Sequence, residues 1–149
     1  MSMYSDKVME HFKNPRNVGE IKNADGIGEV GNPICGDIMK IYIKVGTKNK
    51  EEYISDIKFE TYGCIAAVAT SSALTDLAKK ETLKEALKIN ARDIVKSLGG
   101  MPAIKLHCSV LAQDALAEAL YDYYKKHARA IPEKLMNLHK NIIERQKRL

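Results

Sequence analysis

Long apolar runs and paired cysteines are both missing from this sequence of 149 residues. No apolar stretch reaches the ~18 residues that a membrane-spanning helix requires, so we predict no membrane association. The cysteine count of three is odd, which argues against a disulfide framework. The first residues also lack the features of a signal or transit peptide. We therefore expect a cytoplasmic protein with reduced thiols.

A concentrated basic surface is missing as well. The net charge is +5 and the pI about 9.0, but acidic residues are interleaved with the basic ones except near residues 140–148. Nucleic-acid-binding proteins usually carry a denser basic stripe, or aromatic side chains that stack on bases in a basic groove. We therefore predict no nucleic-acid partner and favour a docking surface for an acidic protein.

The length and composition are those of an ordinary globular domain. Hydrophobic residues make up 45% of the chain and charged residues 29%. A chain of this size should bury roughly 70% of the surface that its unfolded form exposes. We expect one domain over residues 1–149, with a core that needs neither a metal nor a disulfide for its stability.

Hydrophobic periodicity predicts strands first and helices afterwards. Apolar and polar residues alternate over residues 39–45 and 57–61, separated by a polar turn at 46–50, and a glycine-rich strand is expected near 27–31. Ile54 falls out of register, which predicts a bulge or a bend near Ser55 and Asp56. These strands should form an antiparallel meander.

The remaining pattern is helical. We predict helices over residues 4–13, 64–80, 82–89 and 91–98, another from about Cys108, and a last one over about 132–148. The alanine-rich helix over 64–80 should be largely buried. In the helix after Cys108, Asp114 and Glu118 lie on the polar face. The fold class is therefore α+β: a small three-stranded antiparallel sheet with helices packed on one face.

Each cysteine lies at a turn or a helix end. Cys35 is in a glycine-flanked turn, Cys64 lies where a strand meets a helix, and Cys108 follows His107 near a helix start. A helix N-terminus favours a thiolate by about 0.3–1 kcal/mol, and Lys105 would add positive charge near Cys108. Three buried cysteines acting as small hydrophobic residues are the alternative.

These residues could form a metal centre with both tight and weak ligands. Thiolate and imidazole suit zinc and iron, whereas the carboxylate of Asp37, two residues after Cys35, is a harder ligand that competes poorly with thiolate. Asp37 alone would also be explained as a turn-forming residue. The adjacent His107 and Cys108 can reach one metal only from turn-like backbone, which we expect there.

Four ordered motifs carry a family resemblance over about residues 4–125. They are Tyr4-Ser5 with His11-Phe12 and Asn14-Pro15-Arg16-Asn17-Val18-Gly19; Gly31-Asn32-Pro33-Ile34-Cys35-Gly36-Asp37; Thr61-Tyr62-Gly63-Cys64 with Ser71-Ser72; and Lys105-Leu106-His107-Cys108-Ser109-Val110-Leu111-Ala112. Together they closely resemble the IscU/NifU-type iron–sulfur cluster scaffold family. The resemblance implies a SufE/NifU-like fold on which a [2Fe–2S] cluster is assembled and handed on, by a scaffold and not an enzyme.

The resemblance also implies the ligands and the partners. The ligands would be Cys35, Cys64 and Cys108 with one or both of His107 and Asp37, binding iron, or zinc when no cluster is present. A PLP-dependent cysteine desulfurase would supply persulfide sulfur to Cys108, or to Cys64. Apo iron–sulfur proteins would accept the cluster, a ferredoxin could donate electrons, and a homodimer could share a cluster.

One segment departs from the family pattern. The chaperone-binding motif usually reads Leu-Pro-Pro-Val-Lys, and the corresponding residues here are Met101-Pro102-Ala103-Ile104-Lys105. The lysine and one proline are kept, but the leading leucine and the second proline are lost. A DnaK-type chaperone is therefore an open partner.

Two other functions are compatible with the same residues. A zinc-dependent sulfurtransferase would keep Zn²⁺ bound while Cys108 relays sulfur from a desulfurase. A structural zinc protein would unfold when its metal is removed, which the expected core size argues against.

Overall fold

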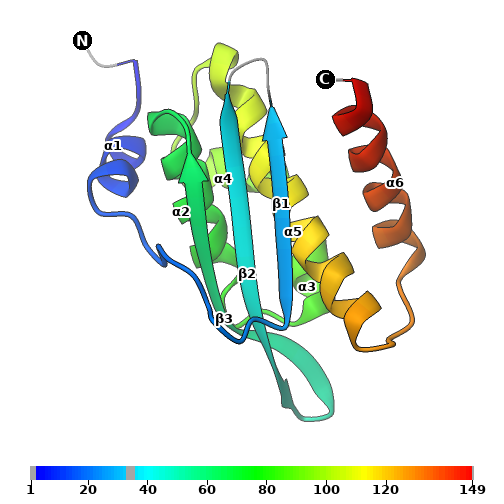
Figure 1. The fold of residues 1–149 in the computed structure, drawn as a ribbon. Coiled ribbons are helices and arrows are strands. Elements are labelled where there is room, and N and C mark those ends of the chain that lie inside the picture. The colour runs from blue at the N-terminus through cyan, green and yellow to red at the C-terminus, as the bar shows by residue number, and fades with distance from the viewer. Residues whose placement is uncertain (1–2, 33–35, 149) are drawn as a thin grey trace.

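In the computed structural model, which describes residues 3–32 and 36–148, one three-stranded antiparallel sheet is backed by helices (Figure 1). The strands are β1 (Gly26–Asn32), β2 (Asp37–Lys48) and β3 (Glu51–Tyr62), in that order across the sheet. The helices are α1 (Asp6–Lys13), α2 (Ile65–Ala78), α3 (Leu83–Lys88), α4 (Ala91–Ser97), α5 (Leu106–Lys126) and α6 (Glu133–Arg148), with a 3-10 turn at Ala103–Lys105. The predicted α+β meander is confirmed. Among the described residues, none of the helices could cross a membrane.

The β2–β3 hairpin is longer than the alternation of side chains predicted. Pairing continues to Lys48 and Glu51, so the turn consists only of Asn49 and Lys50. Both turn residues have left-handed backbone, with φ of 52° and 65°. Such a two-residue turn matches the right-handed twist of the strands that it joins. The polar residues predicted as a loop extend the strands instead, because backbone pairing at the end of a sheet does not require apolar side chains.

The bulge predicted near Ser55 is confirmed. Lys44 pairs with Asp56, but the next residue of β2 pairs with Ile54, so Ser55 is an extra residue in β3. The Ser55 hydroxyl donates a hydrogen bond to the Lys44 carbonyl oxygen at 3.1 Å. Because of the extra residue, Ile54 and Ile57 both point into the core, where both are fully buried.

α5 lies directly on β1 because two glycines leave room for the helix backbone. A Cβ atom on Gly26 would lie 2.3 Å from the Ala119 carbonyl oxygen, and one on Gly28 would lie 2.2 Å from the Ala115 carbonyl oxygen. Ala115 and Ala119 are themselves fully buried. The strand and the helix therefore meet through backbone and methyl groups, and this contact sets the position of α5 on the sheet.

The rest of the core lies between the sheet and the two central helices. β2 contributes Met39, Ile41 and Ile43, each fully buried, to the face that the helices cover. α2 packs against β3 and α5, and ten of its residues are buried. The prediction that this alanine-rich helix is largely buried is therefore confirmed.

α6 covers the polar face of α5. Its apolar residues Leu135 and Ile142 are buried, and Arg145 lies 3.0 Å from the carboxylate of Asp114. Burial raises the pKa of Asp114, while the charge of Arg145 opposes that shift. The face of α5 that carries Asp114 is thus a helix–helix interface, which its sequence pattern did not reveal.

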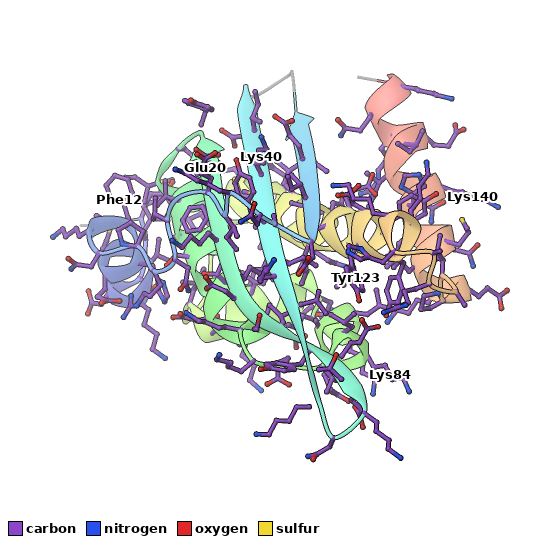
Figure 2. All side chains as sticks on the ribbon, turned by 60° about the horizontal axis from the view of Figure 1, so that its bottom comes forward. Phe12, Glu20, Lys40, Lys84, Tyr123 and Lys140 are labelled. Atoms are coloured by element: carbon purple, nitrogen blue, oxygen red, sulfur yellow. The ribbon has the colours of Figure 1, made fainter. Side chains whose placement is uncertain are left out.

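α1 packs on α2, on the side of the domain opposite α6, as the positions of Phe12 and Lys140 illustrate (Figure 2). Two groups of the N-terminal segment contact the same hydroxyl group of α2, that of Ser72. The His11 Nδ1 atom lies 2.7 Å from Ser72 Oγ, and the backbone N–H of Arg16 donates to the same oxygen at 2.9 Å. The first sequence motif therefore holds the N-terminal segment against α2.

Replacing Gly28 with alanine should destabilise the protein strongly, because the new methyl group would overlap the backbone of α5. We expect the free energy of unfolding to fall by about 3 kcal/mol, the upper end of the usual range for overpacking. Urea unfolding followed by circular dichroism would measure this loss. Gly31→Ala is the control: its Cβ would meet nothing nearer than 3.6 Å, and stability should change by less than about 1 kcal/mol. Equal losses in the two variants would contradict the packing argument.

Candidate metal centre

Four of the side chains singled out from the sequence meet at one end of the domain. Asp37 begins β2, and Cys64 is the N-cap residue of α2, two residues after the end of β3. His107 and Cys108 lie in the first turn of α5. The start of β2 is paired with the end of β3, which places Asp37 near Cys64. The ends of β2, α2 and α5 thus bring together one group of potential metal ligands.

Cys35 lies outside the described residues, together with Pro33 and Ile34. Its part in the centre therefore stays a prediction from the sequence. The described chain resumes at Gly36, which has a φ of 75°. That left-handed conformation favours glycine over residues with a side chain, and it immediately precedes the first donor in the structure, Asp37.

Three of the donor atoms are separated by distances close to those that a tetrahedral metal requires. Cys108 Sγ lies 3.5 Å from Asp37 Oδ2 and 3.6 Å from His107 Nε2. His107 Nε2 lies 3.7 Å from Asp37 Oδ2, and the Cys64 and Cys108 sulfur atoms are 4.0 Å apart. Zinc–ligand bonds of about 2.0–2.3 Å at tetrahedral angles would separate the ligand atoms by about 3.3–3.8 Å. Asp37, His107 and Cys108 therefore fit a common metal ion, with Cys64 adjacent.

His107 and Cys108 reach the same point although both are helical. The expectation of turn-like backbone at these two residues is wrong, because α5 begins at Leu106. The Cα–Cβ bonds of an α-helix tilt toward its N-terminus, so side chains of the first turn extend past the helix end. Two adjacent residues can therefore both direct their donor atoms in front of the helix, where Asp37 lies.

The centre combines buried and accessible donors. Cys108 is fully buried and Asp37 is 4% exposed, whereas the side chain of His107 is 35% exposed. Burial, and then the neighbouring Cys64 and Asp37, raise the pKa of the Cys108 thiol well above its usual value. The helix end was expected to favour the Cys108 thiolate, but in the metal-free protein burial favours the thiol. A helix dipole contributes only about 0.3–1 kcal/mol, and desolvation outweighs it.

The segment aligned with the chaperone motif lies beside this centre. Ala103–Lys105 form the 3-10 turn that leads into α5, and Ile104 is 70% exposed. Electrostatic interaction with Cys64 is the largest cause that raises the pKa of the exposed Lys105. Lys105 thus supplies positive charge near the sulfur atoms. The apolar side chain of Ile104, the preceding residue, is open to solvent.

Two further residues support the centre, and neither was assigned to it from the sequence. A Cβ atom on Gly63 would lie 2.6 Å from Asp37 Oδ1. The Thr70 hydroxyl donates to the Ala66 carbonyl at 2.8 Å and lies 3.4 Å from the Cys108 carbonyl oxygen. Gly63 precedes Cys64 in one of the four motifs, so the sequence could have indicated that Gly63 belongs to the centre. No sequence pattern connects Thr70 with Cys108, because only the packing of α2 on α5 brings them together.

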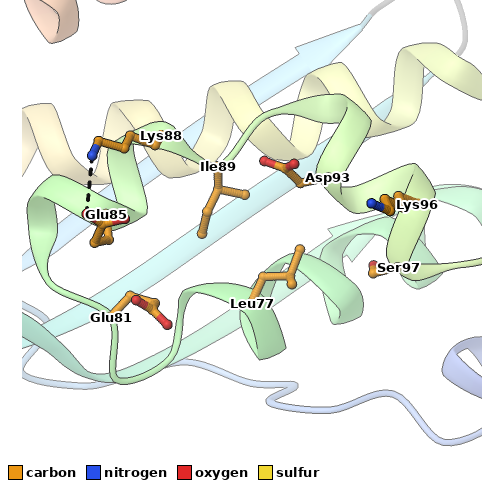
Figure 3. Close-up of a pocket in the computed structure, with 8 residues that line it drawn as sticks. All are labelled: Leu77, Glu81, Glu85, Lys88, Ile89, Asp93, Lys96 and Ser97. Atoms are coloured by element: carbon orange, nitrogen blue, oxygen red, sulfur yellow. Dashed lines mark hydrogen bonds and ion pairs between the residues drawn. The ribbon is translucent and has the colours of Figure 1, made fainter.

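A separate hollow lies between α2, α3 and α4, away from the sulfur atoms (Figure 3). It has a volume of about 610 Å³, and Leu77 and Ile89 provide its apolar lining. The other lining residues are Glu81, Glu85, Lys88, Asp93, Lys96 and Ser97. Leu77 is about 20 Å along α2 from Cys64, at 1.5 Å per residue. With no cysteine or histidine in its lining, this hollow is not the metal centre.

Comparison with known proteins agrees with the fold and with the four motifs. The family model described as the NifU-like N-terminal domain matches residues 3–130, a stretch that ends just before α6. The chain belongs to the IscU/NifU family of iron–sulfur cluster assembly scaffold proteins.

Individual relatives are similar over most of their length. The iron–sulfur cluster assembly scaffold protein IscU 1 of Archaeoglobus fulgidus is 53% identical over 145 residues, which cover 97% of this chain and 92% of the relative. IscU of Escherichia coli K12 is 48% identical over 126 residues, which cover 83% of this chain and 95% of the relative. A crystal structure described as a SUF-system iron–sulfur cluster assembly scaffold, from Fervidobacterium islandicum AW-1, has a TM-score of 0.63 at 23% identity and covers 79% of this chain and 96% of its own. That last likeness supports the fold alone.

Alkaline pH should destabilise the metal-free protein through Cys108. Below about pH 8.5 the thiol is protonated in both the folded and the unfolded state. Above that pH the unfolded state loses the proton while the folded state keeps it, so the free energy of unfolding falls by up to about 1.4 kcal/mol per pH unit. Urea unfolding between pH 7 and pH 9.5, with a chelator and a reductant present, would measure this slope. Cys108→Ser should show a shallower slope, and parallel curves for the two proteins would contradict the assignment.

Proposed function

We propose that this protein is a scaffold on which a [2Fe–2S] cluster is assembled from iron and sulfide and then passed to apo acceptor proteins. The observation that carries the proposal is the convergence of two thiols, an imidazole and a carboxylate at one end of the domain. Membership of the IscU/NifU family supports it. The proposed ligands are Cys35, Cys64 and Cys108, with one or both of His107 and Asp37.

The contacts of Cys108 suit a ligand that gives up a proton when the centre is loaded. A thiol must lose its proton to bind a metal, so loading releases that proton. The Cys108 thiol donates to Asp37 Oδ2 at 3.5 Å, which places a carboxylate where it can accept the proton. In the empty protein, the raised pKa of Cys108 keeps the thiol protonated and weakens its affinity for metal.

Asp37 is the proposed weak ligand. Carboxylate is harder than thiolate and competes poorly with it for iron–sulfur centres. Its position within 4 Å of Cys108 and His107 would let it occupy one coordination position that another ligand can replace. A centre of this kind binds a cluster reversibly, which is what transfer to an acceptor requires.

Sulfur is proposed to arrive as a persulfide from a PLP-dependent cysteine desulfurase. Cys108 is the proposed main acceptor once its proton has been removed, and the more accessible Cys64 is the alternative. The two sulfur atoms are 4.0 Å apart. A thiolate on either residue could therefore attack the outer sulfur of a persulfide on the other, which forms a new persulfide and releases the first thiolate.

The remaining partners follow from this role. We propose apo iron–sulfur proteins as acceptors, a ferredoxin as electron donor, and a cytoplasmic setting. A homodimer could share a cluster through the accessible side of the centre. A DnaK-type chaperone would contact residues 101–105, where the exposed Ile104 provides an apolar side chain.

A zinc-dependent sulfurtransferase is the second candidate. The observation in its favour is that Asp37, His107 and Cys108 already have the spacing of a mononuclear zinc site. In this function Zn²⁺ would stay bound while Cys108 relays sulfur. The two candidates differ in what the protein contains after turnover.

Anaerobic reconstitution with ferrous iron, cysteine, a cysteine desulfurase and a reduced ferredoxin, which supplies the electrons that convert persulfide sulfur to sulfide, separates the two functions. For a scaffold we expect visible absorption and circular dichroism of a bound cluster, with equal amounts of iron and acid-labile sulfide. Cys64→Ser and Cys108→Ser should each abolish these signals, because each removes a thiolate ligand. Sulfur relay with Zn²⁺ retained and no acid-labile sulfide would instead establish the sulfurtransferase.

Asp37→Ala should slow cluster transfer and lengthen the lifetime of the loaded protein, because it removes the exchangeable ligand. We expect roughly a tenfold slower transfer to an apo-ferredoxin, equivalent to about 1.4 kcal/mol in activation free energy, with transfer followed by circular dichroism. Asp56→Ala is the matched control. Asp56 lies on β3 opposite Lys44, six residues from Tyr62 at the metal-centre end, which is about 20 Å in a strand. Transfer at the wild-type rate in Asp37→Ala would rule out the proposed role of this carboxylate.

A further inference from the structure

We propose that Gly63 is a positioning residue of the metal centre, because its missing side chain leaves the space that the Asp37 carboxylate occupies. A Cβ atom on Gly63 would lie 2.6 Å from Asp37 Oδ1 and 3.0 Å from Asp37 Cγ. Real Cβ atoms essentially never approach other heavy atoms as closely as the 2.6 Å to Oδ1. A side chain at position 63 and the Asp37 carboxylate therefore cannot both occupy their present positions, and one of them would have to move.

Backbone conformation does not explain the glycine. Gly19, Gly36, Gly99 and Gly100 have positive φ, the region that favours glycine, but Gly63 does not. Its backbone is thus open to any residue, and only the space beside it is restricted. The restriction comes from Asp37 and from Ala67, whose Cβ atom would lie 2.8 Å from a Cβ at position 63.

The two oxygen atoms of Asp37 have different neighbours, and this makes the position of the carboxylate matter for chemistry. Oδ1 faces Gly63, whereas Oδ2 lies 3.5 Å from Cys108 Sγ and 3.7 Å from His107 Nε2. A methyl group at position 63 would push Oδ1 away and rotate or shift Oδ2 with it. Gly63 therefore controls whether Asp37 can act at the same point as the other donors. The inference deepens the proposed function, since it rests on Asp37 being a ligand of that centre.

A double-mutant cycle tests this link. It compares the wild type, Gly63→Ala, Asp37→Ala and the double variant by Zn²⁺ affinity, measured in competition with a chromophoric chelator, and by thermal unfolding without metal. In the wild-type background, Gly63→Ala should weaken Zn²⁺ binding about tenfold and lower the melting temperature. In the Asp37→Ala background, it should change the affinity less than twofold and lower the melting temperature less. The contact with Ala67 is present in both backgrounds and cancels.

Co²⁺ provides a spectroscopic readout that a purely structural effect would not reproduce. The visible absorption of the Co²⁺-loaded Gly63→Ala protein should match that of Asp37→Ala, because both lack the carboxylate oxygen at the metal. Gly31→Ala is the matched control, since its Cβ would meet only ordinary contacts, and its spectrum and Zn²⁺ affinity should equal those of the wild type.

Equal losses of Zn²⁺ affinity in the two backgrounds, or no loss in the wild type, would overturn the inference. If Gly63→Ala fails to fold, folding restored by Asp37→Ala would support it, and failure in both backgrounds would overturn it. These measurements need no cluster. Failure of cluster assembly by the wild-type protein would therefore count against the proposed function and leave the result for Gly63 unchanged.

Discussion

The direct contact between the backbone of α5 and the glycines of β1 sets the geometry of the metal centre. Ala115 of α5 meets Gly28, and from there Cys108 is about 10 Å back along the helix. β1 continues about 13 Å past Gly28 to Asn32, which pairs with Asp37. The helix and the strand run in opposite directions, so Cys108 and Asp37 reach the same level. Bulkier residues at the two glycines would separate α5 from the sheet and the thiol from the carboxylate.

Burial gives the centre its chemical character. Cys108 and Asp37 are almost completely shielded from water, and a thiolate beside a carboxylate would place two negative charges together in that setting. The metal-free protein avoids this cost by keeping the Cys108 thiol protonated and hydrogen-bonded to Asp37. A bound cation removes the conflict, because it is attracted to both donors. The same pair thus suits an empty state and a loaded state, and the accessible His107 leaves one side open to partners.

Sequence patterns were reliable where the cause is local. Alternation and helical periodicity depend on neighbours a few residues apart, which is why the meander, the bulge at Ser55 and the order of the helices are confirmed. Sequence patterns were less reliable where packing against a distant element determines the environment of a residue. The raised pKa of Cys108, for example, comes from burial beneath other elements. The pattern of polar residues on α5 did not predict that Arg145 of α6 would pair with Asp114 there.

By itself, the sequence determined the family, the fold class and the kinds of donor atom, because motifs and side-chain chemistry are properties of the chain. Only the tertiary structure decided which donors meet, which are buried and in which protonation state the empty centre rests. Donor separations of 3.5–4.0 Å between residues as far apart as Asp37 and Cys108 arise from packing across the whole domain. The glycine that makes room for Asp37 is a matter of free space, and free space exists only once the chain has folded.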